Sequence, residues 1–449
     1  MKKTLLSFLI CTAATLPACT QHTPASLDSL MDAYVKVNGF NGTVFAATKD
    51  TVIFEKGYGY KNKSANARND TNTIFQIGSI TKQFTAAIIL RLMEQRKLSL
   101  QDSLTKYIPD YPNGNKITIE NLLTHTSGIY NYTNDVAFMV DGSTHPISRD
   151  SLINRFKYKP LDFSPGQKFN YSNSGYTLLG YIIEKVTGQS YFQVVRQQIF
   201  EPLHMDHSGF DFTHLNSPDK AIGYTTPEST TPANIVDSSV SFAAGAIYTT
   251  VGDLYKWDRA LRAGQIISPA SQEKAYTPHL AQYGYGWFVI TMYNKKVVEH
   301  GGGITGFVSD IRRIPEDETC IIVLDNQPNQ ANPSNIARDI LAILNGKDVK
   351  LPETKVATTA ETTVDTTILR QYIGVYEISP TFSIAVTLDG GRLYGQATGQ
   401  GKFELFAEKK DAFFLKVVRA EVEFVRGADN KVEKLILHQN GQDITGKRL

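Results

Sequence analysis

The pattern of apolar and polar residues predicts an α+β region followed by a region of short strands. Residues 42–47 and 51–60 are rich in β-branched and aromatic residues on either side of Lys49-Asp50, which predicts a β-hairpin. A buried helix is expected over 79–97, and a second helix is expected to end at Gly188. Strand patterns return over 284–326 before a closing helix. This order predicts an α+β fold built on an antiparallel sheet.

The C-terminal part of the chain has a different pattern. Residues 347–367 are rich in Thr and Glu without apolar periodicity, which predicts a linker between a first domain at 20–346 and a second at 368–449. About eight short apolar-polar alternations follow, separated by turn residues such as Asp389-Gly390-Gly391. They predict a small up-and-down β-barrel or a sandwich.

The first 19 residues have the pattern of an export signal. Lys2 and Lys3 precede an apolar run at 5–16, and the run ends in a lipobox-like sequence at Cys19. Cleavage before Cys19 and lipidation of its thiol would anchor the protein to the outer membrane. Pro17 is not favoured inside a lipobox, so plain secretion to the periplasm is the alternative.

Charge and cysteine content narrow the function classes. The formal net charge is +2 and no Lys/Arg block occurs, so nothing predicts a nucleic-acid partner. Beyond the signal region the only cysteine is Cys320, within an apolar strand pattern. A single thiol cannot form an intramolecular disulfide, and we expect Cys320 to be a core residue.

A Ser-x-x-Lys spacing occurs four times, and context singles out Ser79. Only Ser79 stands at the start of a buried helix, where Lys82 would lie one turn away on the same face. A buried lysine near a helix N-terminus loses its charge more easily, and it could then take the proton of the serine hydroxyl. The alternative is a helix-capping serine with an ordinary lysine.

Two further motifs could complete a catalytic site. Tyr171-Ser172-Asn173 forms a polar turn before a buried helix, and a phenol held near a lysine could ionise more easily and relay protons. His300 is followed by three glycines after a strand, which would let a ligand approach the backbone closely. The alternatives are a packed turn tyrosine and a β-bulge with a structural histidine.

In this order, the three motifs resemble those of serine β-lactamases and penicillin-recognising DD-peptidases, especially the class C and esterase-like branch. Segments 122–129, 201–210, 243–257 and 283–287 also resemble that branch. The resemblance implies an antiparallel sheet flanked by helices, with the active site facing an all-helical lobe. The second domain resembles the lipocalin-like appendages of some relatives.

The resemblance assigns roles to residues of this chain. Ser79 would be the nucleophile with Lys82 as its partner, and Tyr171 would be the general base and acid. Asn173 would contact the substrate amide. The N–H groups of Ser79 and Gly303 would form the oxyanion hole, and Gly302 and His300 would line the substrate-binding strand. No metal or organic cofactor is implied.

The sequence departs from the usual Lys-Thr-Gly motif, because His300 stands where dedicated β-lactamases carry lysine. A neutral, shorter histidine would hold a β-lactam carboxylate less well. We therefore expect a serine hydrolase for small amide or ester substrates, such as D-aminoacyl peptides, more than a dedicated β-lactamase. The alternative is a penicillin or peptidoglycan sensor that is acylated without turnover. The sequence does not indicate an oligomeric state.

Four further histidines are expected to be structural. His204, His207 and His214 lie near aspartates, but their spacing fits no standard zinc motif. His125 lies in a family segment, and we expect it to form a structural hydrogen bond.

Overall fold

The computed structural model describes residues 24–227, 229–328, 331–353, 361–379, 382–397, 402–416, 420–439 and 442–449. The predicted signal region with Cys19 lies outside the described residues, as does the middle of the predicted linker. No helix in the described part of the chain combines the length and apolar character needed to cross a bilayer.

The first domain contains a six-stranded antiparallel sheet in the order β2-β1-β10-β9-β8-β7. Its strands are β1 (Gly42–Thr48), β2 (Thr51–Gly57), β7 (Phe288–Met292), β8 (Lys295–Ile304), β9 (Phe307–Ile314) and β10 (Thr319–Asp325). The predicted hairpin is confirmed, because β1 pairs with β2 and both turn residues, Lys49 and Asp50, have positive φ. Shorter strands are β3 (Tyr60–Asn62), β4 (Ala67–Arg68), β5 (Phe75–Gln76) and β6 (Tyr248–Thr249).

Alternating residues of the central strands belong to two separate cores. In β10, Ile321 and Val323 pack in the core that contains helices α1 (Pro24–Asn38) and α10 (Pro333–Leu344). The intervening residues, Cys320 and Ile322, pack in the larger core of the helical lobe. Successive side chains of a strand point to opposite faces, so both faces of this sheet are covered. The expectation that Cys320 is buried is confirmed.

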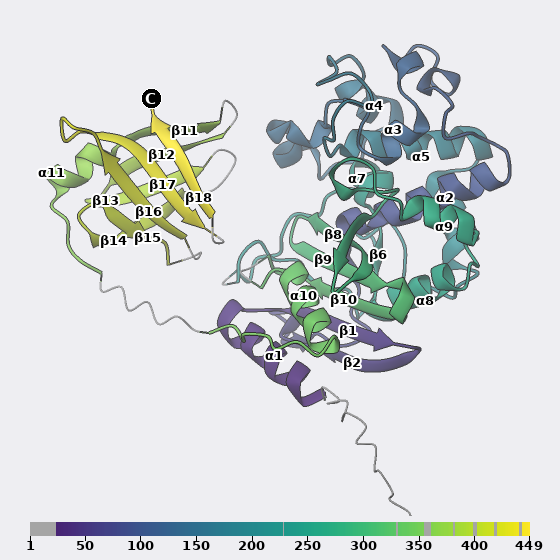
Figure 1. The fold of residues 1–449 in the computed structure, drawn as a ribbon, viewed down its shortest axis with the longest axis horizontal. Coiled ribbons are helices and arrows are strands. Elements are labelled where there is room, and N and C mark those ends of the chain that lie inside the picture. Colours follow the sequence, from purple (N-terminus) through teal and green to yellow (C-terminus); the bar gives the residue numbers. More distant parts are fainter. Residues whose placement is uncertain are drawn as a thin grey trace, which may run out of the picture.

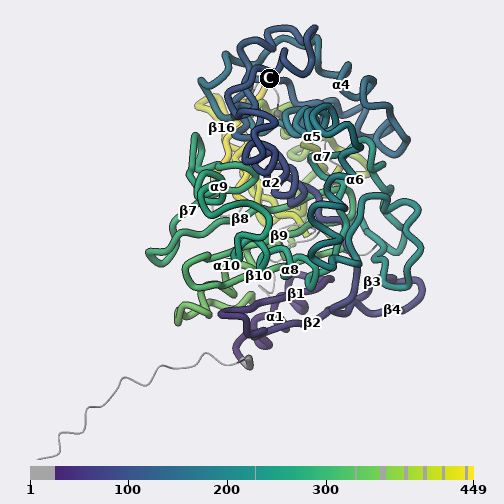
Figure 2. The backbone as a smooth tube through the Cα atoms, turned by 90° about the vertical axis from the view of Figure 1, so that its right-hand side faces the viewer, coloured from purple at the N-terminus to yellow at the C-terminus, as the bar shows by residue number. Residues whose placement is uncertain are grey.

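The helical lobe covers the second face. Its helices are α2 (Thr81–Glu94), α3 (Ile119–Leu123), α4 (Arg149–Lys157), α5 (Asn173–Thr187), α6 (Tyr191–Val195), α7 (Ser238–Gly245), α8 (Val251–Arg262) and α9 (Pro269–Ala275). Figure 1 and Figure 2 both place α4 and α5 at one end of this domain and α1 at the other. Helix α5 ends as predicted, with Gly188 in the left-handed conformation that favours glycine.

The second domain is a closed eight-stranded barrel, which decides between the two predicted architectures. Its strands are β11 (Gly374–Ser379), β12 (Phe382–Asp389), β13 (Arg392–Ala397), β14 (Lys402–Lys409), β15 (Ala412–Phe414), β16 (Ala420–Arg426), β17 (Val432–Gln439) and β18 (Gln442–Arg448), preceded by the short helix α11 (Thr366–Leu369). Pairing of β11 with β18 closes the barrel. Alternation fills its interior: Val422 and Phe424 are buried, whereas Glu421 and Glu423, which alternate with them, are exposed.

Candidate functional site

Ser79 lies in a 3₁₀ turn, Gly78–Ile80, directly before α2. The sequence predicts a helix from Ser79, whereas the α-helix itself begins at Thr81. Gly78 has φ +50°, and a Cβ there would lie 2.8 Å from the backbone nitrogen of Gly303, so only glycine fits where this turn packs on β8. Ser79 is partly exposed although its two neighbours are buried, which leaves its hydroxyl accessible to a ligand.

Lys82 is completely buried one turn further along the chain. Its Nζ lies 2.9 Å from Ser79 Oγ. The same atom donates to Asn173 Oδ1 and to the Ala244 carbonyl oxygen, each at 2.8 Å. None of the three oxygen atoms belongs to a carboxylate, and burial lowers the pKa of Lys82 well below its usual range.

When Lys82 is neutral, these contacts allow its lone pair to be directed at Ser79. A neutral amine has two N–H donors and one lone pair. Asn173 Oδ1 and the Ala244 carbonyl oxygen can only accept hydrogen bonds, so they take both N–H groups. The lone pair is then left for the proton of the Ser79 hydroxyl. The arrangement can therefore activate the serine as a nucleophile.

Asn173 reaches Lys82 from the first residue of α5. Its Nδ2 donates to Thr133 Oγ1 at 3.1 Å, which fixes the amide with Oδ1 towards Lys82. The sequence predicts that Asn173 contacts the substrate. In this structure both ends of its amide are occupied by protein groups, and its contact to Lys82 orients the amine.

The Tyr171 ring lies beside Lys82, with Nζ 4.8 Å from the ring centroid. Its hydroxyl is buried without a hydrogen bond of normal geometry to any described residue. Burial raises the pKa of Tyr171, and the neighbouring Ser79 hydroxyl only partly offsets this rise. The expected easier ionisation is thus reversed, because burial disfavours the charged phenolate. Tyr171 is therefore suited to donate a proton.

His125 holds the backbone on both sides of Tyr171. The Asn170 N–H donates to the His125 carbonyl oxygen at 2.9 Å, and the Ser172 N–H donates to His125 Nδ1 at 3.1 Å. The His125 and Tyr171 rings also pack together, with centroids 4.2 Å apart. The predicted structural hydrogen bond of His125 is confirmed, and its effect is to position Tyr171.

The glycine-rich end of β8 runs beside the nucleophile. Strand β7 pairs with β8 only from Lys295 to Glu299, so the following residues extend beyond it. A Cβ at Gly302 would lie 2.0 Å from the Ile77 carbonyl oxygen, whereas a Cβ at Gly303 would meet nothing within 4 Å. Gly302 thus allows two backbone segments to approach each other. Only Gly303 is exposed and suited to contact a ligand.

His300 lies beneath the site and not on its surface. Its side chain is 2% exposed. The Tyr283 hydroxyl lies 3.0 Å from Nε2, and Nδ1 lies 2.6 Å from the Gly301 carbonyl oxygen, so Nδ1 carries the proton and Nε2 accepts. Burial lowers the pKa of His300 to about 3. The predicted weak carboxylate contact is corrected here: a buried, neutral ring has no charge or free donor for a ligand.

The histidines near residue 204 do not form a metal centre. Within the described residues, no group of three or more His, Cys, Asp or Glu side chains is arranged to hold a metal ion. His214 Nδ1 instead lies 2.9 Å from Asp211 Oδ1 on the exposed surface.

Two groups at this site were missed by sequence reasoning. The Ala244 carbonyl oxygen lies in a segment that carries the resemblance, but a backbone acceptor has no residue signature. Phe242, with φ +38° and ψ −132°, interrupts α7 just before it. The Tyr283 hydroxyl also lies in a recognised segment. Its partner is His300 Nε2, and only folding brings the two groups together.

Comparisons with known proteins show which families and folds the chain resembles. Residues 27–344 match a family model described as Beta-lactamase, and residues 358–448 match one described as Domain of unknown function (DUF3471). Penicillin-binding protein 4* of Bacillus subtilis (strain 168) is 29% identical over 442 residues, which cover 93% of this chain and 97% of that protein.

Two solved structures share the fold. The octameric penicillin-binding protein homologue from Pyrococcus abyssi has a TM-score of 0.65 and 28% identity, covering 94% of this chain and 99% of its own. The D-stereospecific amidohydrolase from Streptomyces sp. has a TM-score of 0.61 and 26% identity, covering 72% of this chain and 99% of its own. The first similarity spans both domains, whereas the second covers less of this chain.

Proposed function

Because the chain belongs to the beta-lactamase family, we propose that it is a serine hydrolase that forms a covalent acyl-enzyme through Ser79. The observation that carries the proposal is the environment of Lys82. Its amine is completely buried, has no carboxylate partner among the described residues and lies 2.9 Å from Ser79 Oγ. A lysine in such a place is a base and not a structural cation.

Acylation begins when Lys82 Nζ takes the proton of Ser79 Oγ. The oxygen attacks the substrate carbonyl carbon and forms a C–O bond. The negative charge on the carbonyl oxygen is stabilised by the N–H groups of Ser79 and Gly303. The bond to the leaving nitrogen or oxygen then breaks, and the Tyr171 hydroxyl donates the proton that the leaving group needs. Lys82 returns its proton to Tyr171.

Deacylation repeats these steps with water. A water molecule takes the position of the departed group, and its proton passes through Tyr171 and Lys82 as its oxygen attacks the acyl carbon. The ester bond to Ser79 breaks, Ser79 Oγ regains a proton, and the carboxylic acid leaves. The unpartnered hydroxyl of Tyr171 supports turnover, because it has a free hydrogen-bonding position for this water.

The favoured substrates are small amides or esters with a D-aminoacyl group. Similarity to a D-stereospecific amidohydrolase supports this class. The buried, neutral His300 argues against a site specialised for the carboxylate of a β-lactam. Slow acylation by penicillins is compatible with the similarity to penicillin-binding protein 4*.

The test is covalent labelling of the wild-type protein and of Ser79→Ala with a fluorophosphonate probe. We expect labelling of wild type alone. Absent labelling of wild type, or equal labelling of Ser79→Ala, would refute the proposal. Hydrolysis of D-aminoacyl p-nitroanilides, p-nitrophenyl esters and nitrocefin then ranks the substrate classes, with the corresponding L-aminoacyl anilide as the stereochemical control.

The same assays separate a hydrolase from a sensor. A sensor would release one equivalent of product in a burst and then stop, because its acyl-enzyme persists. A hydrolase shows a steady-state rate after any burst. We expect the steady-state rate on the best ester or anilide.

The leader pattern supports a further proposal, that the protein is exported and lipid-anchored through Cys19. Incorporation of a labelled fatty acid in the producing cells tests it. We expect labelling of wild type and none of Cys19→Ala, and equal labelling of the two would contradict the assignment.

A further inference from the structure

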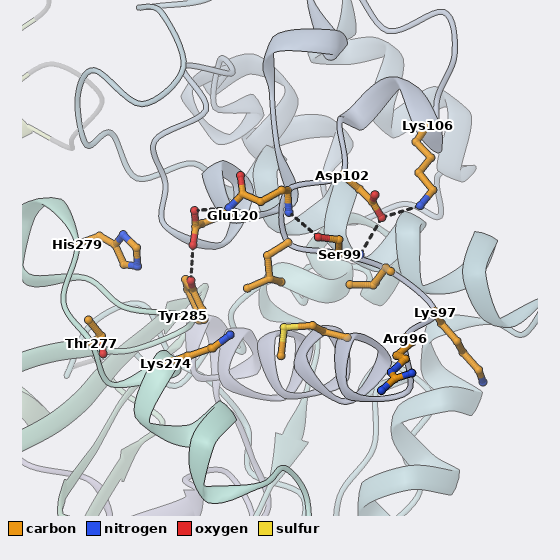
Figure 3. A pocket seen from close by; sticks show the side chains of 14 residues that line it. Arg96, Lys97, Ser99, Asp102, Lys106, Glu120, Lys274, Thr277, His279 and Tyr285 are labelled. Carbon is orange, nitrogen blue, oxygen red and sulfur yellow. Dashed lines mark hydrogen bonds and ion pairs between the residues drawn. The ribbon is translucent and has the colours of Figure 1, made fainter.

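A cavity lies at the opposite end of α2 from Ser79. It has a volume of about 680 Å³ and is formed by the end of α2 and the chain just after it, the start of α3, the end of α9 and the loop that follows α9. Figure 3 shows the side chains that surround it. Helix α2 has 14 residues, so at 1.5 Å per residue the cavity is about 20 Å from the nucleophile. None of the residues assigned to catalysis lines it.

Both carboxylates of this cavity are occupied by protein donors. Asp102 Oδ2 accepts a hydrogen bond from Lys106 Nζ at 2.8 Å. Glu120 accepts from the Tyr285 hydroxyl at 2.5 Å and from Gln101 Nε2 at 2.9 Å. Figure 3 shows these interactions as dashed lines. Both carboxylates therefore already have protein hydrogen-bond donors, and their negative charges count in the net charge of the lining.

Three cations of the lining remain unpaired. Arg96, Lys97 and Lys274 are exposed, and their side chains form no hydrogen bond or ion pair with another described residue. They come from two segments that are distant in the sequence. With Lys106 and the two carboxylates, the lining has a formal net charge of +2.

We infer that this cavity binds a small multivalent anion that carries phosphate or carboxylate groups. Its volume is within the range of about 300–1,000 Å³ that is typical of small-molecule sites. The Arg96 guanidinium offers the planar pair of donors that suits phosphate or carboxylate oxygens. The Lys274 ammonium supplies a second charge from the other segment. The stacked rings of His279 and Tyr285, with centroids 5.4 Å apart, form an aromatic wall.

The alternative is that these cations are simply solvated. A solvated surface attracts anions weakly and without saturation, and any lysine elsewhere would contribute equally. A built site requires Arg96 and Lys274 together. The experiment therefore compares their loss with the loss of an equal charge outside the cavity.

Isothermal titration of the full chain with pyrophosphate or citrate, at low ionic strength, makes this comparison. We expect saturable binding of at least one probe with a Kd of about 1 mM, weakened about tenfold or more in Arg96→Gln/Lys274→Gln. The control is Lys116→Gln/Arg370→Gln, which removes the same charge at two exposed positions outside the cavity. The control should bind like wild type.

Preference for pyrophosphate would identify a phosphate site, and preference for citrate a carboxylate site. The inference is overturned if neither probe binds saturably, or if both double variants lose binding equally. The outcome is independent of the proposed hydrolase activity, because labelling of Ser79 can be measured separately on the same variants.

Discussion

Two buried basic residues of the first domain, Lys82 and Arg313, have opposite surroundings. Arg313 is 2% exposed, but its guanidinium donates to Asp258 and to the Tyr276 hydroxyl. Burial alone would lower the pKa of Arg313, and the nearby Tyr276 and Asp258 more than offset this and raise it. Lys82 is equally buried, but its hydrogen bonds with the described residues go only to neutral oxygen atoms, and burial lowers its pKa.

The difference distinguishes a buried charge with a structural role from a buried amine with a chemical role. A buried charge with a carboxylate partner stays charged and connects elements, here β9 with α8. A buried amine without such a partner gives up its proton more easily, as the proposed role of Lys82 as a base requires. The missing carboxylate beside Lys82 is thus as informative as the contacts that are present.

The first prediction tests Lys82 by replacing it with a cation that keeps its proton. In Lys82→Arg the guanidinium stays charged and offers no lone pair to the Ser79 hydroxyl. We expect the rate of fluorophosphonate labelling to fall by about 10³-fold, within the range for loss of a general base. The matched control, Lys116→Arg, replaces an exposed lysine and should label normally. A labelling rate of Lys82→Arg close to wild type would contradict the role of Lys82.

The second prediction concerns Arg313. Asp258→Asn leaves the Arg313 charge buried without a carboxylate, so the free energy of unfolding should fall by about 3–5 kcal/mol. Urea unfolding followed by circular dichroism measures it. Glu273→Gln removes an exposed partner of Lys296 and should change stability little. Equal effects of the two substitutions would show that burial does not distinguish these pairs.

The third prediction concerns the loss of folding stability as the pH falls. The pKa of His300 is lowered to about 3 in the folded protein from an ordinary value of 6.5, so below pH 6.5 the unfolded chain binds more protons. Stability is therefore lost as the pH falls from 6.5 towards 3. Between pH 7 and pH 5, wild type should lose about 2 kcal/mol more stability than His300→Gln.

Urea unfolding at the two pH values checks this difference. Groups whose titration does not depend on His300 contribute equally in both proteins and cancel in the comparison. If wild type and His300→Gln lose the same stability, His300 is not held neutral by burial.

The smallest expected effect concerns the positioning of Tyr171. His125→Leu removes the acceptor of the Ser172 N–H, and we expect kcat to fall about tenfold with KM little changed. In His125→Asn the side-chain oxygen can accept the same hydrogen bond, and part of kcat should return. His145→Leu, at an exposed histidine, is the control. Equal kcat values for His125→Leu and wild type would exclude a positioning role.

Periodicity was sufficient to predict most of the fold. The alternation in β10 and in the barrel strands follows directly from the geometry of a strand, and Gly188 ends its helix because it can adopt positive φ. The start of α2 was harder to predict. The contact of Gly78 with Gly303 places Ser79 in a 3₁₀ turn, and a contact between residues so distant in sequence has no local signal.

The site was predictable where a side chain has distinctive chemistry. Ser79, Lys82 and Tyr171 form motifs, and the structure brings them together. The burial of His300 was not predictable from the sequence, because it depends on the Tyr283 hydroxyl and on strand β9 beside it. The raised pKa of Tyr171 could not be inferred either, since it follows from the burial of its ring in the folded chain. A sequence does not show whether a buried residue has a charged partner in the folded protein.

The most direct test of the account is the pH dependence of Ser79 acylation. Intact-protein mass spectrometry would follow the fluorophosphonate adduct over time between about pH 5 and pH 10, with Ser79→Ala as the blank. We predict that the rate rises with pH through a single ionisation well below the ordinary lysine value of 10.5 and that Ser79→Ala stays unlabelled. A rate that rises only near the ordinary lysine value, or a labelled Ser79→Ala, would contradict the claim that a neutral Lys82 activates Ser79.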